Sequence, residues 1–192
     1  MNYHIFATQA SSVAWIIFCI IWIVAMFSAK QSARSANVYL TAYRLGIAAI
    51  VGVLFVLAHS IGTFGDIVNY YTHNVIVQSI GVALVYIGIG VAVWARFYLG
   101  RNWGMPMSEK KGAELVTKGP YAYVRNPIYS GILLAIAGSA LSIAFFWVFI
   151  FIAYAAYLSP SVFVEEKIMT RLFPEQYPAY KARTKRLIPW VW

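Results

Sequence analysis

The amino-acid sequence predicts an all-α fold, a polytopic membrane bundle of about five transmembrane helices. The composition indicates a membrane protein, because 61% of the 192 residues are hydrophobic and 11% are charged, whereas soluble domains carry about 25% charged residues. The apolar residues also form runs that are long enough to cross a bilayer as helices, which takes about 20 residues each. The fifteen Lys and Arg residues lie between these runs, at their edges or after them, as basic loop residues do in membrane proteins.

Three predicted spans lie in the first half of the chain, at 13–29, 43–61 and 75–95. The third span contains Gly81, Gly88 and Gly90. Small residues in a membrane helix let a neighbouring helix approach closely. We therefore expect the third span to pack tightly against another one.

The apolar run at 128–160 is too long for one straight span. It contains 33 residues, and a helix of that length would extend about 50 Å, well beyond the ~30 Å hydrocarbon core of a bilayer. Gly138-Ser139 and Leu141-Ser142 offer a break near the middle. The prediction is therefore a hairpin of two short spans, at 128–141 and 144–161, and a single tilted span is the alternative.

The distribution of positive charge predicts how the bundle is oriented. The N-terminus and the 62–74 loop contain no Lys or Arg, and cytoplasmic loops carry the excess of these residues in membrane proteins. We therefore expect the N-terminus outside, and the long loop at 96–126 and the C-terminal tail in the cytoplasm. The tail is predicted to contain an amphipathic helix at 162–173 and a short helix near Tyr180.

The chain is interpreted as one membrane domain, 1–192, in which 1–95 supplies three spans and 96–192 supplies the long loop, the hairpin and the tail. The net charge of +9 is attributed to bilayer orientation and anionic lipid headgroups, and no nucleic-acid binding is predicted. Cys19 is the single cysteine, which excludes an intrachain disulfide and a cysteine-based zinc site. No metal site is predicted.

The densest polar and turn-forming segment is 119–131, which follows the long loop. Pro127 is predicted to be the first residue of a helix, a position that proline favours. A helix N-terminus has unpaired N–H groups and a partial positive charge, which suit an anion. Arg125 adds a cation, and the tyrosines add aromatic faces and hydroxyl groups. The alternative is an ordinary membrane-entry loop, where Arg and Tyr are common.

A second unusual feature is the adjacent pair Glu165-Glu166, near the expected cytoplasmic end of an apolar helix. The helix dipole disfavours acids at a C-terminal end, so a compensating cation is expected. One interpretation is an ion pair with Arg125, Lys118 or Lys167, or simple solvation. The other is a carboxylate that binds ribose hydroxyls or the cationic end of a cofactor. The histidines, at 4, 59 and 73, are expected on the outer side, away from both features.

The motifs of the second half resemble those of a known family. In order they are 99–103 (LGRNW), 114–121 (ELVTKGPY), 124–131 (VRNPIYSG), Glu165-Glu166, 172–177 (LFPEQY) and 186–189 (RLIP). Their order and spacing, over roughly 96–189, resemble the isoprenylcysteine carboxyl methyltransferase family and its phospholipid methyltransferase relatives. The resemblance implies an all-helical membrane bundle with S-adenosylmethionine bound on the cytoplasmic side, between the last spans and the tail.

The resemblance also implies site residues. The cofactor would be bound by Glu114, Leu115, Val116, Tyr121, Asn126, Pro127, Ile128, Tyr129 and Glu165. We assign catalytic roles to Arg125, Tyr129 and Glu166, and binding of the acceptor to Arg101 and Asn102. Two positions depart from the family pattern: Asn126 stands where the family usually has His, and Ser161 lies near the position of an Arg that in eukaryotic members is thought to meet a substrate carboxylate.

The function predicted from these motifs is methyl transfer from S-adenosylmethionine to a lipid or lipidated acceptor. Carboxyl O-methylation of an isoprenylcysteine-like substrate is the first expectation. The alternatives are N-methylation of a phospholipid ethanolamine headgroup, an NADPH-dependent membrane reductase, and a non-catalytic membrane protein.

Overall fold

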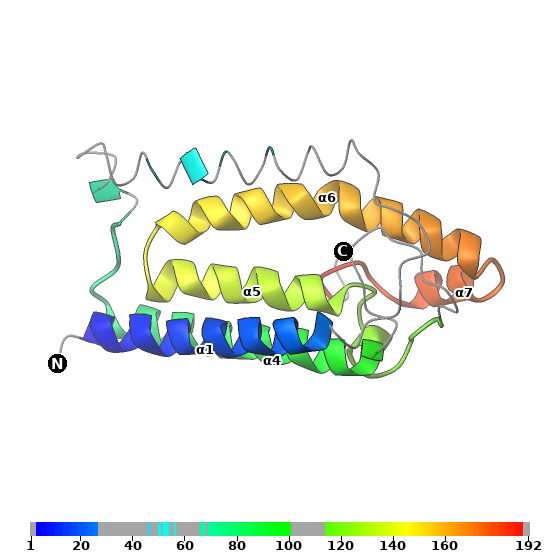
Figure 1. Ribbon diagram of the computed structural model, residues 1–192, viewed down its shortest axis with the longest axis horizontal. Coiled ribbons are helices and arrows are strands. Elements are labelled where there is room, and N and C mark those ends of the chain that lie inside the picture. Colours follow the sequence, from blue (N-terminus) through cyan, green and yellow to red (C-terminus); the bar gives the residue numbers. More distant parts are fainter. Residues whose placement is uncertain are drawn as a thin grey trace.

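The computed structural model describes residues 3–26, 46, 50, 52–53, 56, 66–67, 69–100 and 114–189. In these residues the chain is helical and has no strand, which confirms the all-α prediction. The helices α1, α4, α5 and α6 run side by side along the long axis of the molecule, and α7 lies at one end (Figure 1). Among them α1, α4 and α6 are long and apolar enough to cross a membrane, and α5 is a shorter apolar helix.

The first predicted span corresponds to α1, Tyr3–Met26. The predicted start at residue 13 was wrong, because the helix begins ten residues earlier. Polar side chains in that first part have partners inside the bundle: Tyr3 Oη lies 2.5 Å from Ser79 Oγ, and Ser11 Oγ lies 2.9 Å from Ser142 Oγ. The second predicted span, 43–61, lies mostly outside the described residues, which include only 46, 50, 52–53 and 56 of it.

The third predicted span is confirmed as α4, Val75–Leu99. Asn74 caps its N-terminus, because Asn74 Oδ1 accepts hydrogen bonds from the backbone N–H groups of Ile76 (2.9 Å) and Val77 (3.3 Å). Such a cap satisfies donors that have no partner within the helix. The helix is therefore fixed at the end that lies away from the polar motifs.

The predicted hairpin is also confirmed, and one continuous tilted span is excluded. Helix α5, Pro127–Ser142, is followed by a short turn and then by α6, Phe146–Leu172. The predicted hairpin span and the predicted amphipathic helix are thus one helix, which continues through Pro160. A proline removes a helix hydrogen bond, and the adjacent Ser161 hydroxyl donates to the carbonyl of Tyr157 at 2.8 Å. The expected short helix near Tyr180 is α7, Gln176–Arg183.

Helices α4 and α5 are in direct backbone contact. A Cβ atom placed on Gly88 would lie 2.5 Å from both Ala135 N and Gly131 O, and one on Gly81 would lie 2.8 Å from Gly138 O. Gly90, in contrast, has nothing within 4 Å of its Cβ position. The close packing expected of the third span is therefore confirmed for two of its three glycines. Because this contact joins two rigid helices, it sets where α5 begins relative to the end of α4.

We predict that Gly88→Ala destabilises the bundle while Gly90→Ala does not. The added methyl group at position 88 meets backbone atoms of α5 that cannot yield cheaply, and such overpacking costs about 1–3 kcal/mol. At Gly90 the same change has open space and gains helix propensity. Thermal unfolding of both variants in detergent, followed by circular dichroism, checks this. Equal melting temperatures for the two variants would contradict the packing described.

Candidate functional site

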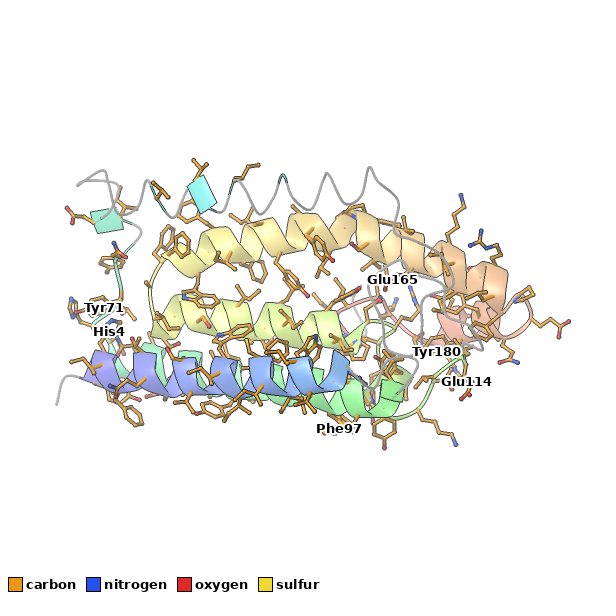
Figure 2. All side chains as sticks on the ribbon, viewed as in Figure 1. His4, Tyr71, Phe97, Glu114, Glu165 and Tyr180 are labelled. Atoms are coloured by element: carbon orange, nitrogen blue, oxygen red, sulfur yellow. The ribbon has the colours of Figure 1, made fainter. Side chains whose placement is uncertain are left out.

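The two polar features meet at one end of the bundle. Figure 2 places Glu114, Glu165 and Tyr180 at this end, and His4 and Tyr71 at the opposite end. The end is formed by the last turns of α4, the 3₁₀ helix η2 (Gly119–Ala122), the start of α5, the end of α6, and α7. The prediction that both features lie together and away from the histidines is confirmed for His4.

An apolar cluster forms the centre of this end. Ala95, Tyr121 and Ile128 are buried, and Leu99, Val116, Tyr129, Ile132 and Trp22 pack against them. Four of the predicted cofactor-binding residues, from three different segments, thus meet in one place: Val116, Tyr121, Ile128 and Tyr129. Trp22, from α1, was not predicted to be near the site.

Local sequence explains how the loop reaches this position. Gly119 has φ +61°, which favours glycine, and a Cβ there would lie 2.6 Å from the ring of Tyr98. Pro120 follows as the second residue of η2. Pro127 is the first residue of α5, as predicted, and its side chain is fully buried.

Glu165 and Tyr129 are in direct contact. The Tyr129 hydroxyl donates a 2.6 Å hydrogen bond to Glu165 Oε1, which joins the start of α5 to the end of α6. Tyr154 and Tyr157, earlier on α6, have stacked rings 5.9 Å apart. The carboxylate is thus bordered by tyrosines in an otherwise apolar region. Two of these tyrosines, Tyr154 and Tyr157, were missed, although position 154 lies on the same face of α6 as 165.

Glu166 is the centre of an ion cluster, which consists of the buried pair Glu166 and Arg125 together with the more exposed Lys181 and Arg186. Its Oε1 accepts from Arg125 Nη2 at 2.7 Å and from Arg186 Nε at 2.9 Å, and its Oε2 lies 3.2 Å from Lys181 Nζ. The side chains of Glu166 and Arg125 are each 7% exposed. Arg125 was one of the partners expected for the acidic pair. Lys181 and Arg186 were missed, because nothing in the sequence shows that the tail folds back onto α6.

Arg125 also binds the tail directly. Besides the two bonds that it donates to Glu166, its guanidinium donates to the carbonyl oxygens of Lys181 (3.2 Å) and Thr184. All of these hydrogen bonds join the Arg125 guanidinium to other groups of the protein. The geometry therefore favours a positioning role for Arg125 and Glu166 over contact with the reacting groups.

The tail is fastened to the loop by backbone and side-chain bonds. Arg125 N donates to Lys185 O at 2.7 Å, and Ser130 Oγ donates to Leu187 O. The Tyr180 hydroxyl donates to Tyr121 O at 2.7 Å, and burial raises the pKa of Tyr180 to about 12. Burial also raises the pKa of Tyr121. Both phenols therefore stay protonated near neutral pH, and the hydrogen bond of Tyr180 keeps its donor.

Asn126 takes part in the same attachment. Its backbone N–H and its side-chain Nδ2 both donate to the Arg186 carbonyl, at 3.0 and 3.1 Å. The position therefore uses a side-chain N–H donor to hold the tail, and an amide can supply that donor without titrating. This gives a physical reason why Asn is compatible with a position where the family that the motifs resemble usually has His.

The remaining predicted residues divide into two groups. Glu114, the first residue of the described segment 114–189, is exposed, and the adjacent Leu115 is half-buried. Arg101 and Asn102, predicted to bind the acceptor, lie outside the described residues.

Comparison with known proteins agrees with the motifs. A family model described as phospholipid methyltransferase matches residues 76–176. The chain is also similar to the cobalt-zinc-cadmium resistance protein CzcN of Cupriavidus metallidurans. The two are 31% identical over 159 residues, which cover 81% of this chain and 68% of that protein.

We predict that Glu166→Gln strongly destabilises the protein and that Lys181→Ala does not. The first change leaves buried Arg125 without its carboxylate, and breaking a buried ion pair costs about 3–5 kcal/mol. The side chain of Lys181 is 46% exposed, and an exposed pair contributes about 0–1 kcal/mol. Denaturant unfolding in detergent micelles measures both. A similar loss of unfolding free energy in the two variants would show that the burial of Glu166 and Arg125 does not determine how much the ion cluster stabilises the protein.

We also predict that Asn126→Asp loosens the tail and that Asn126→His does not. Asp offers no N–H to the Arg186 carbonyl, and losing that hydrogen bond costs about 0.5–1.5 kcal/mol. Because Asp is a good helix cap, global stability is a poor readout. Limited trypsin cleavage after Lys185 and Arg186 reports on the tail itself, and it should be several-fold faster in Asn126→Asp. Unchanged cleavage would rule out this attachment.

Proposed function

The chain belongs to the phospholipid methyltransferase family, and from that we propose that it transfers a methyl group from S-adenosylmethionine to a lipophilic acceptor in the membrane. The observation that carries the proposal is the hydrogen-bonded pair of Tyr129 and Glu165 beside the apolar cluster around Tyr121 and Ile128. A carboxylate, tyrosine rings and a helix N-terminus meet there, and each matches a part of this cofactor.

The donor set fits S-adenosylmethionine group by group. We assign the Glu165 carboxylate to the amine or the ribose hydroxyls, and the positive dipole end of α5, at Pro127 and Ile128, to the cofactor carboxylate. Asn126, whose backbone N–H and side-chain Nδ2 both donate to the Arg186 carbonyl, would border the cofactor without donating these bonds to it. The rings of Tyr121 and Tyr129 suit the adenine and the sulfonium, because cations are attracted to aromatic faces. Glu114, Leu115 and Val116 would line the same pocket.

The protein contributes positioning and exclusion of water. When bound, the cofactor supplies an electrophilic methyl group. Tyr129 orients Glu165 through a 2.6 Å bond, and the ion cluster fixes α6 and the tail around it. Holding two reactants in line can supply about 7–11 kcal/mol of the barrier. Arg125 and Glu166 therefore act by positioning in this proposal, while Tyr129 contacts the reacting groups.

The acceptor that the geometry supports best is an amine headgroup, such as phospholipid ethanolamine. Arg125 is committed to Glu166 and to the tail, and Ser161 uses its hydroxyl on the Tyr157 carbonyl, so these two positions do not present a cation to a substrate carboxylate. An amine must lose a proton before it attacks, and we assign that proton to the Glu165 carboxylate, because the Tyr129 hydroxyl already holds its own proton and donates it to Glu165 Oε1. A prenylcysteine-like carboxylate, which needs no base, is the second candidate, and Arg101 and Asn102 would orient either acceptor.

We propose that the site faces the cytoplasm and that the N-terminus lies outside, because the loops and the tail at the site carry the positive charge. It includes no metal ion and no nucleic acid. The metal resistance in the name of the similar protein is a property of that protein.

We predict that Glu165→Gln abolishes cofactor binding without unfolding the protein. The amide keeps the shape of the side chain but removes the charge that attracts the cofactor amine. Calorimetry on the detergent-purified protein should show S-adenosylmethionine and S-adenosylhomocysteine binding to the wild type and not to this variant. Glu175→Gln is the matched control, because Glu175 is exposed in the turn before α7.

Three results would count against the proposal. Equal cofactor binding by Glu165→Gln and Glu175→Gln would remove Glu165 from the site. Binding of NADPH in place of the methyl donor would indicate a membrane reductase, and binding of none of the three would indicate a non-catalytic protein.

A further inference from the structure

The end of the bundle opposite the candidate site, which we call the far end, is held together through a histidine. His4 is the second residue of α1, and its ring stacks on that of Tyr71, with centroids 3.5 Å apart and planes inclined by 6°. Figure 2 shows the two side chains together at this end. His4 Nδ1 also lies 3.2 Å from Nε2 of Gln78, the fourth residue of α4. We call His4, Tyr71 and Gln78 the far-end cluster. It joins α1 to α4 and to the segment 69–74 that precedes α4.

The hydrogen bonds of Gln78 determine which nitrogen of His4 carries a proton. Gln78 Nε2 donates to the carbonyl oxygen of Thr72 at 2.6 Å, and a carbonyl can only accept, so the amide nitrogen must face Thr72. Its second hydrogen is then directed at His4 Nδ1, which has to accept it. We therefore assign His4 as the neutral tautomer that is protonated at Nε2.

Protonation of His4 conflicts with this arrangement. An imidazolium carries N–H groups at both nitrogens, so its Nδ1–H would face an N–H of Gln78. Turning the amide over would give that proton an acceptor, but it would place Gln78 Oε1 against the Thr72 carbonyl oxygen. Gln78 is 1% exposed, and a buried polar group that loses its partner costs free energy. The stack on Tyr71 is compatible with either protonation state, so the bond with Gln78 decides which state the fold favours.

The neighbouring titratable groups also favour a neutral His4. Tyr71 covers its ring, and the ring of His73 lies 4.8 Å from that of Tyr71. A second imidazole that gains charge in the same pH range repels a charge on the first. On α1 itself the adjacent Tyr3 lies with its hydroxyl 2.5 Å from Ser79 Oγ of α4, which is an uncharged partner.

Segment 69–74 connects the far-end cluster to the turn between α5 and α6. Tyr70 O accepts a 2.8 Å hydrogen bond from Phe145 N in that turn. Asp66 lines a groove with Tyr70 and Phe145, and Figure 1 shows its short helical piece beside the start of α6, away from the start of α1. This acid therefore belongs to the side of the turn. If the contact of His4 opens, the start of α1 is released while the segment stays attached to the turn.

We propose that the far-end cluster is a proton-sensitive latch, which fastens the start of α1 to α4 and to segment 69–74 while His4 is neutral and releases it when His4 is protonated. His4 is half-buried, so protons reach it from solution. An unperturbed imidazole titrates near pH 6.5. A contact that needs the neutral form contributes its full stability above that pH and loses it as the pH falls below. The orientation that we propose would expose the latch to the outer compartment.

Hydrogen exchange tests the inference on the full-length protein in detergent. The amides to follow by mass spectrometry are those in the second turns of α1 and α4, the first that are hydrogen-bonded within each helix. After correction for the intrinsic pH dependence of exchange, the wild type should lose about tenfold in protection between about pH 7.5 and about pH 5.5, because one buried hydrogen bond is lost. Amides in the middle of α4 are the internal reference and should not change.

Substitutions separate the latch from other titrations. In His4→Phe the ring stack is kept, but nothing titrates and no acceptor faces Gln78, so protection should be low and equal at both pH values. His73→Gln is the matched control, because His73 is exposed in the same segment and takes no part in the bond to Gln78, and it should keep the response of the wild type. Gln78→Met, which removes the donor, should abolish the response and serves if His4→Phe does not fold.

A wild type whose exchange at these amides does not respond to pH would overturn the inference. So would a His4→Phe variant that responds as strongly as the wild type, or a His73→Gln variant that loses the response. None of these measurements uses a cofactor or an acceptor, so the outcome is independent of the proposed function.

Discussion

The carboxylate of Glu166 is shared among Arg125, Lys181 and Arg186, which come from the loop before α5, from α7 and from the tail. Taking such charges out of water is expensive, and their attraction repays it only when the geometry is good and the remaining donors are satisfied. Here the remaining donors of Arg125 are satisfied by the backbone carbonyl oxygens of Lys181 and Thr184. The ion cluster therefore holds the loop before α5 and the distant segment formed by α7 and the tail in one arrangement around the end of α6.

This arrangement determines where Glu165 points. Successive residues of an α-helix are turned by about 100°, so when Glu166 faces the tail, Glu165 faces a different neighbour. That neighbour is Tyr129 on α5. The position of Tyr129 is set in turn by the backbone contact of α4 with α5 at Gly88 and Gly131, which brings the start of α5 beside the last turns of α4. Helix packing within the membrane and an ion cluster at its edge thus fix the two halves of one site.

Much of the fold could be predicted from sequence because local chemistry determined it. The start of α4, the start of α5 at Pro127 and the break between α5 and α6 follow from apolar runs and from residues that favour helix ends. The end of α4 was predicted four residues too early, at 95 instead of Leu99. The start of α1 was misplaced because the polar residues before residue 13 resemble a loop until their partners, such as Ser142 and Ser79, are known. The join of the hairpin span to the amphipathic helix was missed because Pro160 resembles a boundary.

The geometry of the candidate site was predictable only in part, for a similar reason. Motif residues identified Tyr121, Ile128, Tyr129 and Glu165, and the structure brings them to the same end. The roles of Lys181, Arg186 and Trp22 depend on long-range contacts that no local pattern encodes. The sequence also could not show that Glu165 and Glu166 have different neighbours. Two adjacent acids share the same local sequence, and only the direction in which each side chain leaves the helix distinguishes them.

The most direct test of the whole account is transfer of a labelled methyl group to lipid. The full-length protein, reconstituted in vesicles that contain phosphatidylethanolamine, would be supplied with S-adenosylmethionine carrying an isotopically labelled methyl group, and the extracted lipids analysed by mass spectrometry. The account predicts label on the ethanolamine nitrogen, or on a prenylcysteine carboxyl when that acceptor is added, and none with Glu165→Gln. Absence of label from every lipid acceptor, in a protein that binds the cofactor, would contradict it.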